Sequence, residues 1–250
     1  MAKVGAPAVC ALCQRTAELQ RSHIIPKFTQ RDIKKADGRM LQFSRTSNPE
    51  GDPVQDAFWE HLLCGICERR LQKWEEYAAR VIYQKRLFDF PSTKPRELRK
   101  LADLNYPKLK LFLLSVLWRM SASSLPLFEQ VRLGPHEQKI RDMLLSEDPG
   151  SVTDYGSTVV VVHLDAERVN LTRPGDVVRH KTHRLYRALL DGLLLTWVVG
   201  NSDHMGRFDL PQMFLQEDGS WLTHSRDLQS IAFLSHESRE FITRESKTRP

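Results

Sequence analysis

Two cysteine pairs constrain this chain more than any other feature. The sequence contains four cysteines, and they form the pairs Cys10-x2-Cys13 and Cys64-x2-Cys67. A two-residue spacer lets both sulfurs of a pair reach one tetrahedral metal ion, so the spacing favours a structural zinc site. Reduced structural cysteines and a redox pair are the alternatives.

The segment that carries the pairs is poor in elements that could build a core. Residues 1–67 contain clusters of turn-forming residues such as "RTSNPEGDP". A helix of about five turns is expected from Glu68, where apolar residues recur at helical spacing. We predict a treble clef, because a knuckle is expected at the first pair, a hairpin between the pairs and a helix at the second pair. Because the metal replaces a core, its removal should unfold this region.

The rest of the chain predicts helices followed by strands. Two prolines within residues 90–95 predict a boundary between a domain of residues 1–90 and a domain of residues 91–250. Helices are expected over residues 107–122 and 133–145, each with proline in its first turn. The first of these is so apolar that its Arg119 needs a buried partner or a route to the surface.

The C-terminal part predicts strands. The run "STVVVVH" is β-branched, and two further strands are expected around the turn Asp191-Gly192. A helix over residues 184–195 is the competing prediction. The fold class predicted is therefore α+β, with an N-terminal zinc-bound treble clef, a helical middle and a small C-terminal antiparallel sheet.

The composition indicates a globular protein of the cytoplasm. Of the 250 residues, 41% are hydrophobic and 27% are charged, which is enough to bury a sizeable core. The N-terminal region lacks the pattern of a signal peptide, and no apolar run reaches about 18 residues, so we expect neither export nor a membrane span. In the cytosol, cysteines are more often metal ligands than disulfides.

The charge balance favours a polyanionic partner. Lysine and arginine exceed aspartate and glutamate by 37 − 31 = +6, which points mildly to nucleic acid. Twelve of the cations lie between Arg69 and Lys110, interleaved with Trp74 and Tyr83. This stretch could grip a phosphate backbone, and an ordinary solvated helix face is the alternative.

The cysteine pairs also belong to a wider pattern. The segments "CALC" (10–13), "RSHIIPKF" (21–28) and "HLLCGIC" (61–67) resemble the zinc-stabilised HNH (His-Me finger) endonuclease motif over roughly the first 75 residues. Residues 111–124 and 131–144 resemble stretches of bacterial proteins of unassigned activity that carry the same zinc motif.

The resemblance implies a metal-dependent endonuclease that hydrolyses phosphodiester bonds in DNA rather than RNA. His23 stands where that family has its general base, and the unperturbed pKa of histidine, about 6.5, suits a proton acceptor at neutral pH. The resemblance also implies a catalytic Mg²⁺ or Mn²⁺ separate from the structural zinc. A hydrogen-bonded structural histidine is the alternative for His23.

Three positions depart from the family motif. Ser22 replaces an aspartate, Trp59 replaces an asparagine, and Glu68 replaces the final histidine. A carboxylate is a good ligand for Mg²⁺ or Mn²⁺, so Glu68 is the candidate ligand of the catalytic cation. Its alternative role is to interact with the positive end of the helix dipole.

Two further side chains are weaker candidates near the same motif. His61 lies close to the cysteines and could act in catalysis or as a spare zinc ligand. Glu75 follows Glu68 by two turns on roughly the same helix face and could reach the same site, although a solvated position is the more common role.

The function predicted is an HNH-type endonuclease, and its alternative is a noncatalytic zinc-bound module that binds nucleic acid or protein. A free nuclease would damage its own cell, so we expect control by a protein partner or activator, such as an ATPase, or a role in anti-phage defence. The sequence leaves the target, the activating signal and the oligomeric state open.

Overall fold

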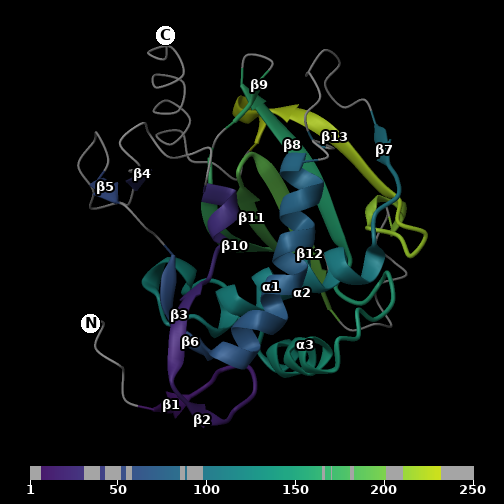
Figure 1. Cartoon of the computed structure of the whole chain (residues 1–250). Helices are drawn as coiled ribbons and strands as arrows, with labels where there is room; N and C mark the ends of the chain where they lie inside the picture. Colours follow the sequence, from purple (N-terminus) through teal and green to yellow (C-terminus); the bar gives the residue numbers. More distant parts are fainter. Residues whose placement is uncertain are drawn as a thin grey trace.

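Three α-helices and a large C-terminal sheet form most of the protein, which therefore belongs to the α+β class (Figure 1). The computed structural model describes residues 7–30, 40–42, 52–54, 58–84, 88, 98–164, 167–169, 171–180, 183–200 and 211–231. The boundary expected at residues 90–95 lies outside the described residues.

The C-terminal sheet has seven strands in the order β10-β11-β12-β8-β13-β7, and β9 pairs with β8. Their bounds are β7 Arg99–Leu101, β8 Ser157–Leu164, β9 Glu167–Arg168, β10 Arg173–His180, β11 His183–Leu190, β12 Leu193–Val199 and β13 Trp221–Asp227. The prediction of a small antiparallel sheet is wrong in two respects, because β7 joins from before the helical middle and β13 runs parallel to β8. Both pairings join distant segments, so no local pattern indicates them.

The hairpin predicted at Asp191-Gly192 is confirmed. Leu190 pairs with Leu193 across the turn, and both turn residues have positive φ, 48° for Asp191 and 76° for Gly192, as two-residue hairpin turns require. A Cβ at Gly192 would lie 2.4 Å from the carbonyl oxygen of Val169. The carboxylate of Asp191 accepts a hydrogen bond of 2.5 Å from the hydroxyl of Tyr83.

The predicted helices are present, with shifted ends. They are α1 Gly65–Ala79, α2 Tyr106–Ala122 and α3 Pro135–Ser146. The first begins three residues before Glu68, directly after Cys64, and continues as the π-helical segment η2 Arg80–Gln84. Asn105 caps α2 by accepting a hydrogen bond of 3.0 Å from the backbone N–H of Lys108. Within the described part of the chain, no helix is both long and apolar enough to cross a membrane.

The N-terminal region consists of three short ribbons, and β3 pairs with β6 in the longest of them. The bounds are β1 Ala8–Val9, β2 Thr16–Ala17, β3 Leu19–His23, β4 Met40–Gln42, β5 Asp52–Val54 and β6 Trp59–Cys64. A 3-10 turn, η1 Lys27–Gln30, follows β3. The other short 3-10 turns are η3 Pro126–Phe128, η4 Pro211–Met213 and η5 Leu228–Ser230.

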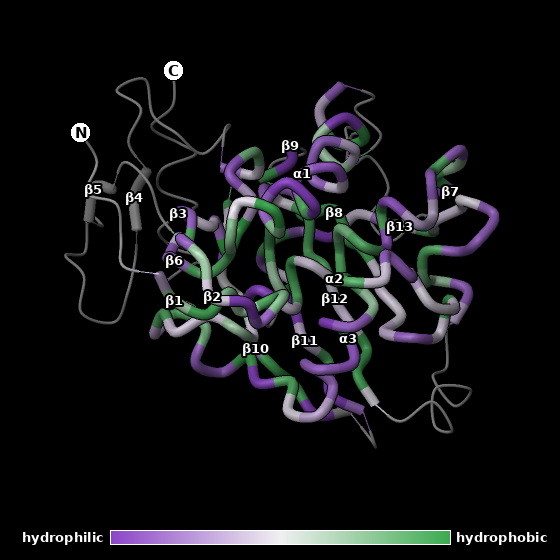
Figure 2. The backbone as a smooth tube through the Cα atoms, turned by 60° about the horizontal axis from the view of Figure 1, so that its bottom comes forward, coloured by the Kyte–Doolittle hydropathy of each residue, from purple (hydrophilic) through white to green (hydrophobic). Residues whose placement is uncertain are grey.

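Helix α2 lies between the sheet and the other helices. It packs on α1 and α3, and nearly all of its residues are buried, which explains why its sequence is apolar on most sides. In Figure 2 the tube is mostly hydrophobic along α2, β8 and β12. One cluster of buried residues extends from Cys10 to Trp221. The division into two domains at residue 90 stays a prediction.

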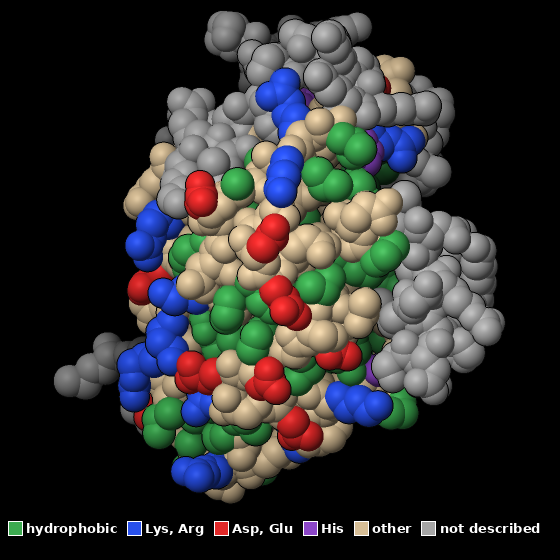
Figure 3. Space-filling model, turned by 90° about the vertical axis from the view of Figure 1, so that its right-hand side faces the viewer, with side chains coloured by type: hydrophobic (Ala, Val, Ile, Leu, Met, Phe, Trp, Pro, Cys, Tyr) green, Lys and Arg blue, Asp and Glu red, His purple; other side chains and the backbone are tan. Residues whose placement is uncertain are grey.

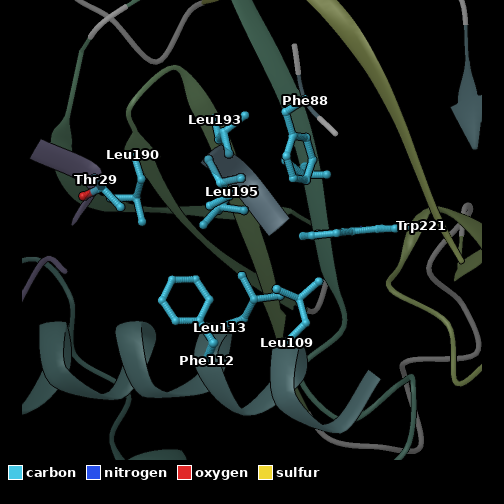
Figure 4. Close-up of a pocket in the computed structure, with 11 residues that line it drawn as sticks. Thr29, Phe88, Leu109, Phe112, Leu113, Leu190, Leu193, Leu195 and Trp221 are labelled. Carbon is cyan, nitrogen blue, oxygen red and sulfur yellow. The ribbon is translucent and has the colours of Figure 1, made fainter. Parts of the chain in front are cut away.

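The sheet and α2 enclose a small apolar cavity of about 20 Å³. Figure 4 shows Leu109, Phe112 and Leu113 from α2 opposite Leu193 and Leu195 from the sheet. Among the described lining residues, the polar side-chain groups are the hydroxyl of Thr29 and the indole N–H of Trp221, and both already donate hydrogen bonds to backbone carbonyls. A space of this size holds about one water molecule, which would need two to four polar partners, so the cavity is a packing defect rather than a ligand site.

Lys110 is buried in the same helix without any exposed surface. Its ammonium group donates a hydrogen bond of 3.2 Å to the carbonyl oxygen of Tyr155. Burial lowers the pKa of Lys110 to about 7, although the charge of Asp154 acts in the opposite direction. The folded state therefore disfavours the charged form that the unfolded chain adopts.

Lys110 should make the stability of the protein depend on pH. Between about pH 7 and pH 10 the unfolded chain binds a proton at this residue that the folded protein does not hold, so the free energy of unfolding should rise with pH. The Lys110→Met variant should lack this rise and should be more stable than wild type at pH 7, by on the order of several kcal/mol. Urea unfolding at a series of pH values measures both effects, and parallel curves for the two proteins would contradict the assignment.

Candidate metal centre and adjacent polar cluster

The two cysteine pairs meet at one point. Their four sulfur atoms all lie within 4.8 Å of one another, and the sulfurs of Cys13 and Cys64 are 3.8 Å apart. Sulfurs bound at 2.3 Å to a tetrahedral zinc ion are separated by about 3.8 Å. The cysteine cluster therefore has the dimensions of a zinc site.

Short turns aim the sulfurs at this point. The backbone N–H of Gln14 donates to the carbonyl of Cys10, closing the first knuckle, and Gln14 has a φ of 59°. Cys64 ends β6 and stands at the N-terminus of α1. Its backbone N–H points at the sulfur of Cys10 over 3.3 Å. An amide directed at a sulfur stabilises a thiolate there.

The electrostatics of the cysteine cluster call for a cation. Burial and the negative charge of Cys10 raise the pKa of the Cys67 thiol, and burial raises that of Cys10. Burial opposes ionisation of Cys64 as well, but hydrogen bonds from the Cys67 backbone and from the other thiols lower its pKa to about 7. Four thiolates cannot coexist this closely without a compensating charge, which a zinc ion would supply.

A polar cluster adjoins the cysteine cluster where β3 faces the first two turns of α1. Glu68 is half-buried on α1, and its Oε1 is buried without a hydrogen bond among the described residues. Burial raises the pKa of Glu68, and the Ser22 hydroxyl lowers it through a hydrogen bond. The charges of Arg119 and His23 lower it further, whereas the charge of Glu75 raises it. These side chains therefore form one electrostatic group.

Arg119 of α2 holds this polar cluster together. Its guanidinium is 2% exposed and lies 2.6 Å from the Glu75 carboxylate. It also donates hydrogen bonds to the carbonyl oxygens of His23 at 2.6 Å and of Ser115 at 3.2 Å. The distance between Arg119 and Glu75 is that of an ion pair, but the angles at this contact are not those of a hydrogen bond. Glu75 and the carbonyl oxygen of His23 are thus the partners that Arg119 needs in its apolar helix. Through them Arg119 joins α2 to both β3 and α1.

The remaining predicted site residues lie on the β3–β6 ribbon, except for Glu75, which lies on α1. His61 is exposed and lies outside the cysteine cluster, with its Nδ1 3.2 Å from the carbonyl oxygen of Leu19. Ser22 is buried, and its hydroxyl accepts a hydrogen bond of 3.0 Å from the backbone N–H of Leu63. Glu75, expected to be solvated, is half-buried and paired with Arg119.

The cysteine cluster is the only group of three or more metal-ligating side chains that comes together among the described residues. Among the described residues, His23 and Glu68 therefore belong to no second group of this kind. Mg²⁺ commonly binds through one or two carboxylates together with water and substrate phosphate. The buried Oε1 of Glu68 is an atom that such an ion could use.

An open groove lies beside the polar cluster. Its volume is about 530 Å³, and its lining residues come from η1, α1 and η2, namely Phe28, Glu76, Ala79, Arg80, Tyr83 and Gln84. The rings of Phe28 and Tyr83 meet edge to face, with their centroids 6.1 Å apart. Residues 24–26 connect His23, the last residue of β3, to η1, and Ala79 on the groove wall follows Glu75 of the polar cluster by one turn of α1.

Several cations of the basic stretch have structural roles. Arg70 donates to the carbonyl of Leu145 near the end of α3, and Lys73 pairs with Glu147 at 2.9 Å. Lys110 is buried against Tyr155. On the face shown in Figure 3, acidic and basic side chains of the described residues are interspersed. The basic stretch is therefore partly used in holding the helices together, a role that differs both from gripping a phosphate backbone and from the solvated helix face that was its alternative.

Comparison with known proteins gives no match: no family model, no curated protein and no solved structure is similar to this chain.

Zinc should hold the N-terminal region in its fold. We expect one zinc ion per chain and loss of that ion in the Cys67→Ser variant, because three sulfurs and a hydroxyl make a weaker site. Chelation should lower the transition temperature measured by calorimetry and disorder the β3–β6 ribbon, since the metal links segments 51 residues apart. Verified metal-free protein with an unchanged transition would contradict a structural metal.

The contacts of Arg119 should contribute more to the free energy of unfolding than an exposed ion pair does. The Arg119→Met variant leaves the Glu75 carboxylate and the His23 carbonyl without this donor, so the free energy of unfolding should fall by about 3 kcal/mol. Lys73→Met is the matched control, because Lys73 pairs with Glu147 in an exposed position, where such pairs contribute about 0–1 kcal/mol. Equal losses in the two variants, measured by urea unfolding, would remove the assigned role.

Proposed function

We propose that this protein is a metal-dependent endonuclease of the HNH type that hydrolyses phosphodiester bonds in DNA. One observation carries the proposal: the cysteine cluster holds the start of β3 next to the start of α1, and Arg119 joins His23 at the end of β3 to α1, whose first turn carries Glu68. These are the two positions at which the motif resemblance places the general base and a ligand of the catalytic cation.

The supporting frame is a zinc-bound treble clef. In this proposal the first knuckle, the β3–β6 ribbon and α1 are its three parts, and zinc bound by the cysteine cluster joins them. Leu19 at the start of β3 pairs directly with Cys64. The metal therefore fixes both the strand that ends at His23 and the helix whose first turn holds Glu68.

Each residue of the polar cluster then has a task. His23 accepts a proton from the water molecule that attacks the phosphodiester. Arg119 is a positioning residue, because it binds the carbonyl oxygen of His23 and the carboxylate of Glu75 without being exposed to substrate. The Glu68 carboxylate supplies a cation ligand through the buried Oε1. A bound Mg²⁺ or Mn²⁺ would neutralise charge that develops on the phosphate.

The groove beside the cluster offers room for the substrate. Arg80 is exposed on its wall, and an arginine there can pair with a phosphate oxygen. The choice of DNA over RNA, control by a partner or activator, a part in anti-phage defence and a cytoplasmic location all come from the sequence and its motif resemblance alone.

A noncatalytic zinc-bound module that binds nucleic acid or protein is the second candidate. The position of Ser22 favours it, because this residue stands where the motif has a metal-binding aspartate. Its buried hydroxyl is engaged with the backbone of Leu63 instead. Without that aspartate, Glu68 would have to supply the cation ligand of the site. A chain that had lost this catalytic site could keep the same zinc-bound fold.

Plasmid cleavage tests the proposal. Wild-type protein with Mg²⁺ or Mn²⁺ should nick or linearise plasmid DNA, and His23→Ala should be slower by at least about a hundredfold, since a positioned base contributes about 10²–10⁴-fold. Glu68→Gln should lose activity in a manner that higher Mn²⁺ concentrations partly restore, because an amide oxygen is a weaker cation ligand.

Asp142→Asn is the matched control for Glu68. Asp142 lies exposed on α3 and accepts a hydrogen bond from Gln138, so its loss should leave cleavage unchanged. Cutting by His23→Ala at the wild-type rate would eliminate the assigned base. Binding of DNA without cutting, with either metal and in the presence of cell extract, would favour the noncatalytic module.

A further inference from the structure

Trp59 is unusual among the five tryptophans of this chain. The other four are buried, with exposed fractions of 3% for Trp74, 1% for Trp118, 0% for Trp197 and 2% for Trp221, whereas Trp59 is partly exposed. Tryptophan presents more apolar area than any other side chain, and leaving it in contact with water forgoes the gain from burying it. A tryptophan retained at the surface suggests a contact that the isolated chain does not make.

Two polar side chains flank the Trp59 ring. The guanidinium carbon of Arg21 lies 3.9 Å from the ring centroid, in stacking contact. The His61 ring meets the indole edge to face, with centroids 5.9 Å apart. Arg21 and His61 are both exposed. The three side chains thus form a surface, here called the Arg21–Trp59 platform, that combines planar groups with positive charge.

The platform lies on the same face of the ribbon as His23. In the register of β3 and β6, Arg21 pairs with His61 and His23 pairs with Trp59. Residues two apart in a strand share a face, and so do directly paired residues. Between these residues, Ser22 is buried, and Glu60 accepts a hydrogen bond of 2.6 Å from the hydroxyl of Ser124.

These groups match the chemistry of a nucleotide with an exposed base. Guanidinium planes and indole rings both stack on nucleobases, and Arg21 is exposed beside the partly exposed ring of Trp59. In a duplex the faces of the bases are hidden within the stack, so only an unpaired nucleotide offers a base to the platform.

We infer that the Arg21–Trp59 platform binds an unpaired nucleotide of the nucleic acid that the proposed nuclease cuts, next to the scissile phosphate. The inference rests on the proposed function for the identity of that phosphate. It makes single-stranded or locally opened nucleic acid the preferred ligand of this face.

Tryptophan fluorescence tests the inference directly. Because the other four tryptophans are buried, acrylamide should quench mainly Trp59. The probe is the His23→Ala protein with its zinc retained, mixed with single-stranded DNA, single-stranded RNA or blunt duplex DNA of equal length. Single strands should shield Trp59 from acrylamide more than the duplex does, and the comparison of DNA with RNA shows which sugar the face accepts.

Binding of the single strand should depend on both members of the platform. Trp59→Ala and Arg21→Met should each weaken it about tenfold, as loss of one stacked base predicts, whereas Trp59→Phe should retain most of it. Lys108→Met is the matched control, since it removes an exposed cation that lies 5.9 Å from the centroid of the Tyr77 ring. Zinc content and circular dichroism establish that each variant is folded.

Three results would overturn the inference. The first two are equal shielding of Trp59 by duplex and single strand, and no shielding by either. The third is equal affinity of the Arg21→Met and Lys108→Met proteins for the single strand. Plasmid cleavage by wild type separates the two proposals. Shielding of Trp59 without any cleavage would retain the platform and remove the nuclease, and cleavage without shielding would do the reverse.

Discussion

Everything in the N-terminal region depends on four sulfur atoms held within 4.8 Å of one another. They come from two segments that are 51 residues apart, and between them only short ribbons are formed by the described residues. A cation bound there would compensate the negative charge of the thiolates and would link the start of β3 to the start of α1. One electrostatic requirement would then set the spacing between the strand of His23 and the helix of Glu68.

The second organising contact comes from outside that region. Arg119 belongs to the central helix, yet its guanidinium binds the last residue of β3 and a carboxylate of α1. A buried guanidinium is stable only when its donors are satisfied, so the polar cluster and the helical middle need one another. A fragment of residues 1–90 would expose Glu75 and release the carbonyl of His23, even with zinc bound.

The parts of this structure that could be predicted are those with local signals. The cysteine spacing located the metal-type cluster, helical periodicity located α1, α2 and α3, and Asp191-Gly192 located a hairpin whose turn requires positive φ. The pairing of β13 with β8 and of β7 with β13 could not be predicted, because both pairings join segments that are far apart in the sequence, and β7 consists only of Arg99, Lys100 and Leu101. The apolar surroundings of Arg119 predicted a need for a partner, but only the packing of α2 on α1 reveals which residues meet that need. The stacking of Arg21 on Trp59 likewise depends on a register shift between Gln20 and Arg21 in β3, which no periodicity discloses.

The helix α1 and its π-helical continuation act as a rod that joins two distant parts of the fold. Fifteen residues of α-helix span about 22 Å at 1.5 Å per residue. One end of the rod begins beside the sulfurs, and the extension at its other end places the hydroxyl of Tyr83 on the turn between β11 and β12. The same rod that starts at the metal-type cluster thus ends on a sheet hairpin, and the Tyr83 hydroxyl makes that last contact through a hydrogen bond to Asp191.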